Sequence, residues 1–242
     1  MNRIALTDSN GESVRLAKRV AAQVPCSRSE AERYIEGGWV RVDDVVVDVP
    51  QARVAPTQTV TLDAQASLLT LTPVTGLVHQ PSDTNPSLPP IGTRWPDDPS
   101  GLRVTPGHWR MLRALLPLPA GAGGLTVFSQ DPRVMRKLTL DALAIEQEWV
   151  VQVEGALAEG GLARLGRGLV WRGQPLPPIK VSWQSEQRLR LALKGIDPAQ
   201  IPWLCEQVGL KVTQWRRIRV GQLPLAGLPA GQWRALMLHE RF

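Results

Sequence analysis

Residues 15–54 constrain the fold more than any other stretch of this chain. Leu16 and Val20 stand four residues apart, as on one face of a helix, and a proline ends the segment soon after them. Ser27 stands three residues before Glu30, which is the spacing of a capping box and predicts the start of a second helix. Two adjacent glycines end that helix. The stretch therefore predicts two short helices in a small unit of their own.

A short hairpin is expected to follow the second helix. Valine-containing runs at 39–42 and 45–49 lie on either side of two aspartates, and a proline closes the unit. The first helix also carries a basic face, because Arg15, Lys18 and Arg19 fall away from its apolar stripe. A small unit with one cationic face suits a polyanionic partner.

The composition limits the classes of protein to which the chain can belong. Hydrophobic residues make up 43% of its 242 residues, so a sizeable core can form. The formal charge is +6 and the pI is about 10.0, which favours a polyanionic partner. Cys26 and Cys205 lie far apart and the three histidines are scattered, so neither a disulfide framework nor a metal site is expected. A polar amino terminus and the lack of a long apolar run predict a cytoplasmic protein without a membrane segment.

The rest of the chain predicts a larger domain of mixed type. Strand-like runs such as 149–157 alternate with a few helical segments, and a proline-rich stretch at 81–101 predicts a long surface loop. The expected fold class is α+β, with a mixed, mainly antiparallel sheet and flanking helices. The expected division is a flexible tail at 1–13, a small domain at 14–62, a linker at 63–75 and a second domain at 76–242.

Residues 15–54 resemble the alpha-L RNA-binding module that is shared with the fourth small-subunit ribosomal protein. The resemblance rests on Arg15, Leu16, Lys18, Ser27, Arg28, Ala31, Ile35, Gly38, Val40, Val42 and Pro50. It implies that RNA meets the helical face that carries five cations, namely Arg15, Lys18, Arg19, Arg28 and Arg33. The helix start at Ser27 adds backbone donors for a phosphate. The alternative is an ordinary solvated basic face, because three glutamates on the second helix dilute the positive charge.

Residues 76–242 resemble the catalytic domain of the ribosomal RNA pseudouridine synthases, in the branch that begins with an alpha-L module. The matching positions are 124–131, 138–139, 146–153, 200–201, Gly209, Val212, 216–221 and 228–236. The resemblance implies a cleft for structured RNA, above all ribosomal RNA. It also implies an activity without metal or cofactor, in which one aspartate helps to detach uracil from its ribose so that the base can turn and rejoin through carbon.

Pro119 occupies the position of that aspartate. In the family the aspartate ends an Arg-Leu-Asp segment, five residues before a Gly-Leu pair, and Leu118 and Gly124 fall into that register here. No Asp or Glu occurs between Arg113 and Phe128. Proline has no ionisable group and no backbone donor, so it cannot replace the carboxylate.

Other positions of the family pattern also differ. The family's lysine and tyrosine before a long strand are Gln147 and Trp149 here, and the tryptophan is a candidate for stacking on a base. The family's Gln-Ile-Arg-Arg motif reads Gln-Ile-Pro-Trp at 200–203. One of those arginines pairs with the aspartate in the family, so both members of the pair are missing from this chain.

A basic run near the end of the chain is a second candidate for RNA contact. It contains Arg216, Arg217 and Arg219, and its alternative interpretation is a solvated strand edge. No residue pattern identifies a protein partner.

Three hypotheses for the function stay open. The first is an RNA-binding protein that keeps the fold and has an inactive or impaired catalytic centre. The second is an active synthase that uses another carboxylate, with Asp131 the nearest candidate and Asp141, Glu146 and Glu148 weaker ones. Asp131 matches an acidic family position that is structural. The third is a scaffold that binds a protein through its nine tryptophans, most of which are expected to pack in the core.

Overall fold

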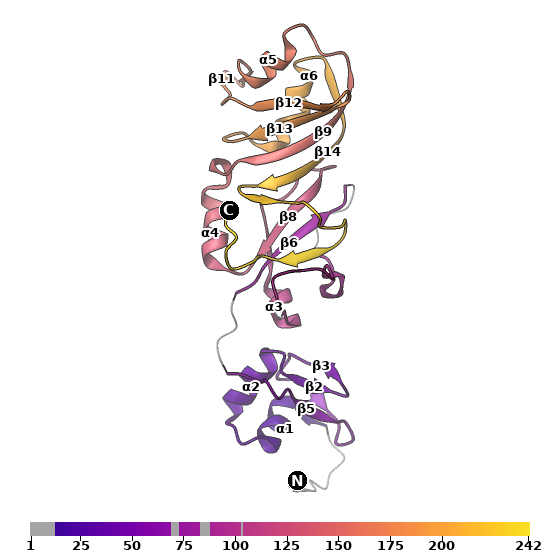
Figure 1. Cartoon of the computed structure of the whole chain (residues 1–242). Helices are drawn as coiled ribbons and strands as arrows, with labels where there is room; N and C mark the ends of the chain where they lie inside the picture. Colours follow the sequence, from indigo (N-terminus) through magenta and orange to yellow (C-terminus); the bar gives the residue numbers. More distant parts are fainter. Residues whose placement is uncertain (1–12, 69–72, 83–87, 103) are drawn as a thin grey trace. The chain divides into compact units, whose positions relative to one another are not determined.

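The computed structural model describes residues 13–68, 73–82, 88–102 and 104–242, which form two compact units (Figure 1). The N-terminal unit comprises the chain up to Thr72 together with Val104–Arg110. The C-terminal unit comprises Pro73–Arg103 together with Met111–Phe242. The predicted tail at 1–13 lies almost wholly outside the described residues, as does the middle of the predicted linker at 63–75, so both stay predictions.

The N-terminal unit contains the predicted helices and hairpin. Its elements are β1 (Val14–Arg15), α1 (Leu16–Gln23), α2 (Arg28–Glu36), β2 (Val40–Val42), β3 (Val45–Val46), β4 (Arg53–Val54) and β5 (Val60–Leu62). The strands pair antiparallel, in the order β3-β2-β5 and as the separate pair β1-β4. Leu16, Val20 and Ile35 are buried between the helices and the strands, as their helical spacing predicts.

The predicted capping box is present at the start of α2. Ser27 Oγ accepts a hydrogen bond from the Glu30 N–H at 3.2 Å, and the Glu30 carboxylate accepts one from the Ser27 N–H at 2.7 Å. After the helix, Gly38 adopts a φ of +67°, and a Cβ built there would lie 2.8 Å from Thr105. Thr105 precedes α3 (Pro106–Met111) and belongs to the segment that joins this unit from later in the chain. The sequence analysis missed that segment, because no local pattern marks it.

The C-terminal unit is built around one large sheet (Figure 1). Its strands are β6 (Thr75–Gln80), β7 (Arg113–Leu115), β8 (Gly123–Ser129), β9 (Gln147–Gly155), β12 (Lys180–Ser185), β13 (Arg188–Leu193), β14 (Leu210–Val220), β15 (Leu223–Pro224) and β16 (Trp233–Ala235). The helices are α4 (Pro132–Leu140), α5 (Gly161–Gly166) and α6 (Ile201–Glu206), and β10 (Val170–Trp171) pairs with β11 (Gln174–Pro175) in a separate hairpin. The strand order is β12-β13-β9-β14-β8-β6-β16, with β15 on β14 and β7 on β8.

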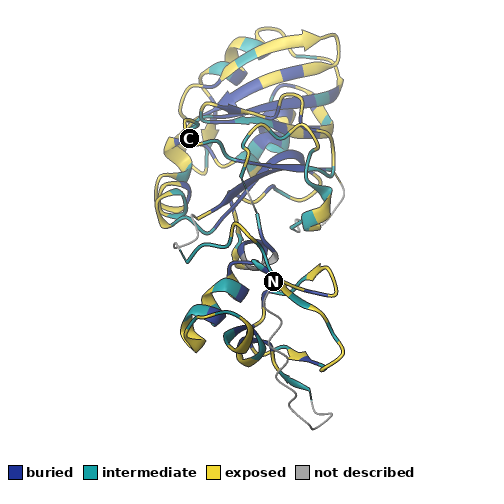
Figure 2. Cartoon of the chain, turned by 60° about the horizontal axis from the view of Figure 1, so that its bottom comes forward, coloured by how far each residue is buried: buried dark blue, intermediate teal, exposed yellow. Residues whose placement is uncertain are grey.

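The sheet is mixed, as expected. Its pairings are antiparallel except between β14 and β8, which run parallel where Arg216 faces Gly123 and Arg217 faces Gly124. Gly124 has a φ of +106°, and a Cβ built there would lie 2.2 Å from the carbonyl oxygen of Arg217. This parallel junction separates two buried clusters, one against α5 and α6 and one on the side of α4. Figure 2 shows buried residues along the central strands and exposed residues alternating along the outer ones.

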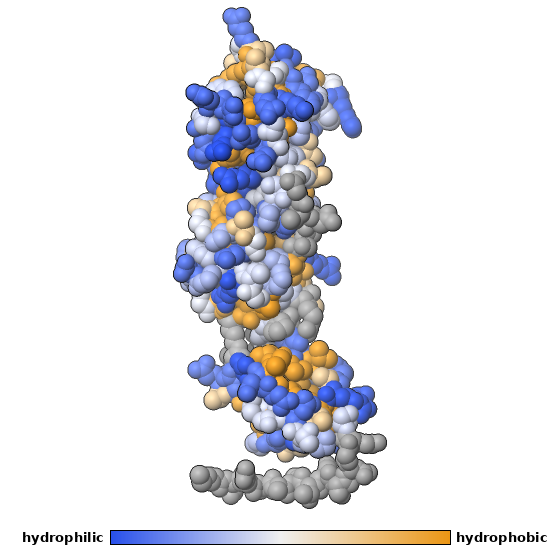
Figure 3. All heavy atoms as spheres, turned by 90° about the vertical axis from the view of Figure 1, so that its right-hand side faces the viewer, coloured by the Kyte–Doolittle hydropathy of each residue, from blue (hydrophilic) through white to orange (hydrophobic). Residues whose placement is uncertain are grey.

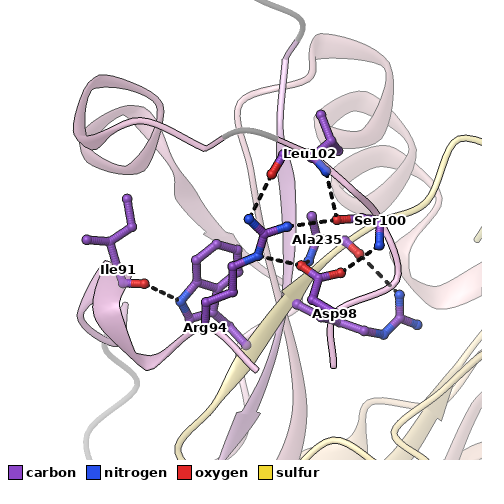
Figure 4. Close-up of polar contacts among 8 residues, drawn as sticks. Ile91, Arg94, Asp98, Ser100, Leu102 and Ala235 are labelled. Atoms are coloured by element: carbon purple, nitrogen blue, oxygen red, sulfur yellow. Dashed lines mark hydrogen bonds and ion pairs between the residues drawn. The ribbon is translucent and has the colours of Figure 1, made fainter. Parts of the chain in front are cut away.

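The stretch predicted as a long surface loop is tied to the sheet where the structure describes it, at 88–102 (Figure 4). The Asp98 carboxylate accepts from Arg94 Nε at 2.7 Å and from the backbone N–H groups of Ser100 at 2.9 Å and Ala235 at 3.1 Å. Arg94 also lies over the ring of Trp233, 5.5 Å from its centroid. The loop therefore acts as a clamp on β16.

Replacement of the central carboxylate of this clamp should weaken the C-terminal unit. Asp98→Asn is expected to lower the free energy of unfolding by about 2 kcal/mol at pH 7, because the amide cannot accept from all three donors. Urea titrations followed by tryptophan fluorescence measure the loss. The neighbouring exposed Asp97, as Asp97→Asn, is the matched control, and equal unfolding midpoints for the two variants would contradict the clamp.

The same carboxylate predicts a pH dependence. Burial by itself raises the pKa of Asp98, but the N–H donors of Ser100 and Ala235 and the Arg94 guanidinium outweigh it and lower that pKa below its ordinary value. The folded pKa thus lies below that of the unfolded chain. The stabilisation is present above about pH 4 and is lost as the pH falls through the folded pKa. The difference in stability between the wild type and Asp98→Asn should therefore shrink below about pH 4.

Candidate nucleic-acid interface

The predicted cations of the N-terminal unit lie on its two helices and at the end of β1. Arg15 and Lys18 are exposed and Arg19 is half-buried, while Arg28 and Arg33 are exposed on α2. The first three make no ion pair with any residue that the structure describes. They therefore leave positive charge available at the start of α1.

The candidate contact groups on α2 already have partners within the protein. Arg28 Nε lies 3.6 Å from Glu32 Oε1, and Arg33 Nη2 donates to the carbonyl of Leu68. The N–H of Ser27 is already bonded within the capping box. The phosphate site predicted at Ser27 therefore starts with one donor already paired, and α1 is the better candidate for the contact face.

A pocket of about 360 Å³ opens in the C-terminal unit where β8, β9 and β14 lie side by side. Its lining contains two arginines, a histidine, several neutral polar groups and one large ring. The described lining residues are His79, Gln80, Pro81, Ser82, Gly123, Gly124, Val150, Gln152, Arg188, Gln214, Trp215, Arg216 and Ala230. No aspartate or glutamate occurs among them. The pocket suits an anionic or hydrogen-bonding ligand.

The loop between β7 and β8 leads into the wall of this pocket and contains Pro119. The Pro119 carbonyl accepts from the Ala122 N–H at 3.1 Å, which closes a turn. Gly121 in that turn is exposed, with a φ of +76°, and a Cβ built there would lie 3.9 Å from Trp215 Nε1. The position at which the resemblance predicts a missing carboxylate is thus in the loop beside Trp215.

Arg217 corrects one of the predicted RNA contacts, because its side chain is only 1% exposed. Nε donates to the carbonyl of Leu125 at 2.7 Å, Nη2 to the carbonyl of Leu116 at 2.6 Å, and Nη1 to Gln147 Oε1 at 2.9 Å. The guanidinium also lies 5.5 Å from the centroid of the Trp149 ring. Burial lowers the pKa of Arg217 to about 9. A buried arginine thus stands beside the Pro119 loop with neutral acceptors in place of a carboxylate.

The neighbours of Arg217 have other surroundings. Arg216 is exposed and lines the pocket, so its side chain is available to a ligand. Arg219 is partly buried, with Nη2 2.6 Å from Glu146 Oε1 and Nε 2.8 Å from Glu148 Oε2. Its predicted contact with RNA would have to compete with these two carboxylates.

These ion pairs involve Glu146 and Glu148, two of the carboxylates considered as alternatives for catalysis. Hydrogen bonds from Arg219 and then from Lys180 lower the pKa of Glu146. A hydrogen bond from Arg190 lowers the pKa of Glu148, against the opposing effect of burial. Both groups are therefore held ionised and paired at neutral pH; they lie just before and at the start of β9, and neither lines the pocket.

Asp131 has the structural role expected for it. Its Oδ1 accepts from the Arg133 N–H at 2.8 Å at the start of α4. It follows the far end of β8 from Gly123, roughly 25 Å away at the rise of an extended strand. Asp141 lies at the other end of α4 and is exposed. Neither carboxylate is placed to act in the pocket.

Trp149, the candidate for base stacking, is fully buried at 0% exposure in the cluster beneath α5 and α6. Its ring lies 5.5 Å from that of Trp215, which is 9% exposed and belongs to the same cluster. In this conformation no face of Trp149 is open to a base. The sequence analysis did not single out Trp215, which directly precedes the basic run and is one of the residues that line the pocket.

The fold and the site together define an S4-domain protein with a pseudouridine synthase fold. A family model described as the S4 domain matches residues 14–60, which confirms the alpha-L module. A solved structure titled pseudouridylate synthase superposes with a TM-score of 0.55 at 19% identity, and the match covers 93% of this chain and 96% of that one. This likeness concerns the fold.

Similarity to curated relatives extends over almost the whole chain. The chain is 25% identical to the dual-specificity RNA pseudouridine synthase RluF of Escherichia coli K12, over 93% of this chain and 76% of the relative. It is 29% identical to the ribosomal large subunit pseudouridine synthase B of Salmonella typhimurium, over 94% of this chain and 81% of the relative. The chain is therefore homologous to these pseudouridine synthases along almost its whole length. In the described residues no helix has the length and apolar character needed to cross a membrane.

Proposed function

We propose that this protein binds structured RNA, most specifically ribosomal RNA in the cytoplasm, and does not isomerise uridine. The observation that carries the proposal is the pocket, which has two arginines but no carboxylate among its described lining residues. Homology to enzymes whose names state RNA or the large ribosomal subunit supports the class of ligand.

The pocket can bind a nucleotide with its own groups. Arg188 and Arg216 can neutralise phosphate, and Gln152 and Gln214 offer amide donors and acceptors. Trp215 is among the lining residues, but it is only 9% exposed and its ring packs on Trp149, so the polar groups supply most of the contacts. Arg188 already donates to Gln152 at 3.2 Å, which orients its guanidinium.

The proposed loss of chemistry follows from what the reaction requires. A carboxylate that attacks or deprotonates the sugar must reach it within hydrogen-bonding distance. Pro119 has no such group. Asp131 and Asp141 lie at the two ends of α4. Glu146 and Glu148 are paired with cations. The buried Arg217 adds support, because its donors already bond to neutral acceptors and do not wait for a carboxylate.

A direct assay tests this part of the proposal. The purified full chain is mixed in excess with ribosomal RNA that carries tritium at uracil C5. It is expected to release no tritium over hours, because no bond forms between uracil C5 and the ribose. An active pseudouridine synthase on the same RNA is the positive control. Stoichiometric release by this chain would reject the proposed loss of activity and favour a non-standard carboxylate.

The cationic face of α1 gives a separate prediction for binding. Changing Arg15, Lys18 and Arg19 together to glutamine is expected to weaken the binding of structured ribosomal RNA about tenfold or more. The slope of log affinity against log salt should fall by about 2 to 3, since each lost phosphate contact removes about 0.9. Filter binding between 50 and 200 mM salt measures both. A matched variant changes the exposed Arg41, Lys194 and Lys211 instead, and an equal loss in the two variants would show that α1 is not the contact face.

A further inference from the structure

We infer that the C-terminal unit carries a second RNA-contact surface, at the end formed by α5, the β10–β11 hairpin and α6. These elements lie together at one end of the unit (Figure 1). We call it the arginine–tryptophan surface and define it by Arg164, Arg167, Arg172, Trp171 and Trp203. The inference rests on the proposed RNA binding but concerns residues outside the pocket and outside the S4 domain.

The surface has uncompensated positive charge. Arg164 on α5, Arg167 directly after it and Arg172 in the hairpin turn are all exposed. None of their guanidinium groups has an ion-pair partner among the residues that the structure describes. From residue 160 to 184 the chain contains no Asp or Glu, and the other cation there, Lys180, is already paired with Glu146 at 3.0 Å. Three unpaired arginines close in sequence attract a polyanion.

The surface also has aromatic rings suited to bases. Trp171 and Trp203 are half-buried and meet edge to face, with centroids 4.6 Å apart and an interplanar angle of 74°. Arg172 lies over the Trp171 ring, 5.4 Å from its centroid. A base can stack on the remaining ring surface while a phosphate meets the guanidinium. This combination of arginine and aromatic ring recurs in proteins that bind single-stranded nucleic acid.

The side chains of the surface are held on a rigid support. Arg172 and Gly173 have φ values of 47° and 80°, which form the tight turn of the hairpin and project Arg172 at its tip. Leu165 and Leu169, between the arginines, are buried in the cluster beneath α5 and α6. Ordered cations lose less entropy on binding than mobile ones. On the side that Figure 3 shows, hydrophilic and apolar side chains lie next to one another at this end of the unit.

The surface lies on the opposite face of the sheet from the pocket. Along β9, Trp149 and Val151 point into the cluster that α5 and α6 cover, whereas Val150 and Gln152 line the pocket. Alternate residues of a strand face opposite sides of a sheet. The surface therefore contacts a different segment of the RNA, or a second strand, and not the nucleotide in the pocket.

The test uses the full chain and a fluorescein-labelled twelve-nucleotide oligouridine as the single-stranded probe. Changing Arg164, Arg167 and Arg172 together to glutamine is expected to weaken binding about tenfold at 50 mM salt. The slope of log affinity against log salt should fall by about 2, since three single-strand phosphate contacts at about 0.7 each are removed. The control changes the exposed Arg136, Lys137 and Lys194 to glutamine, with the same loss of charge and an expected change within twofold.

The outcomes separate this inference from the proposed function. The inference is contradicted if the arginine variant keeps the wild-type slope of log affinity against log salt. It is also contradicted if the control variant loses as much affinity for the oligouridine. A wild type that binds ribosomal RNA but not the oligouridine also contradicts the inference. If the arginine variant loses mainly its binding to polyglutamate, the surface binds an acidic protein instead, and the inference is again contradicted. A wild type that retains neither RNA rejects the proposed function itself.

Discussion

Gly124→Ala should lower the free energy of unfolding by about 4 kcal/mol or more, enough to prevent stable folding of the C-terminal unit. A Cβ at this position would lie 2.2 Å from the carbonyl oxygen of Arg217 and 2.6 Å from its nitrogen. Both obstacles are backbone atoms of the parallel junction between β8 and β14, so no side chain can move aside to relieve the contact. The φ of +106° adds strain, since it is unfavourable for a residue with a Cβ.

Gly92→Ala is the matched control for this substitution. No heavy atom lies within 4 Å of a Cβ built at Gly92, and its φ is outside the left-handed region. Its free energy of unfolding, measured by urea titration, should match that of the wild type within about 0.5 kcal/mol. If Gly124→Ala unfolds at the same urea concentration as Gly92→Ala, the close approach of the two strands at the junction is refuted.

The second large effect is expected at Arg217. Arg217→Ala should destabilise the C-terminal unit by about 3 to 5 kcal/mol, because it opens a cavity beside Trp149 and removes the donors that the side chain supplies to the carbonyls of Leu116 and Leu125. Chemical denaturation followed by tryptophan fluorescence reports the loss near Trp149. The effect should appear without RNA, since it is structural.

Arg216→Ala tests the same strand one residue earlier. Arg216 is exposed, so its removal should change stability by less than about 0.5 kcal/mol and weaken RNA binding instead. The two variants therefore have opposite profiles: one loses stability, and the other loses affinity. A destabilised Arg216→Ala together with a stable Arg217→Ala would reverse the assignment of the buried and exposed side chains.

The two domains were accessible to sequence analysis to different degrees. In the S4 domain, the helices, the capping box at Ser27 and the apolar stripe of Leu16 and Val20 are local features, and the structure confirms them. The segment around Thr105 that completes the N-terminal unit was missed, because its contact with Gly38 joins residues far apart in the chain. The clamp at Asp98 was not predicted for the same reason, because Ala235, which donates to it, is far away in the sequence.

The candidate site shows the same limit. Three arginines within four positions were predicted to share a role, yet one is buried, one is ion-paired and one is exposed in the pocket. Strand alternation and a register shift of β14 against β9 decide which of them faces the core. Likewise Trp149 was chosen by its motif position, whereas the structure buries its ring against that of Trp215.

The sequence by itself determined the class of the fold, the S4 domain, the homology to pseudouridine synthases and the lack of an acidic residue between Arg113 and Phe128. These follow from local spacing and from residue identity, which need no partner distant in the chain. Only the tertiary structure decided which cations meet solvent, what Arg217 bonds to and that the Trp149 ring is buried. Burial and pairing depend on strands that are far apart in sequence and meet only when the sheet has formed.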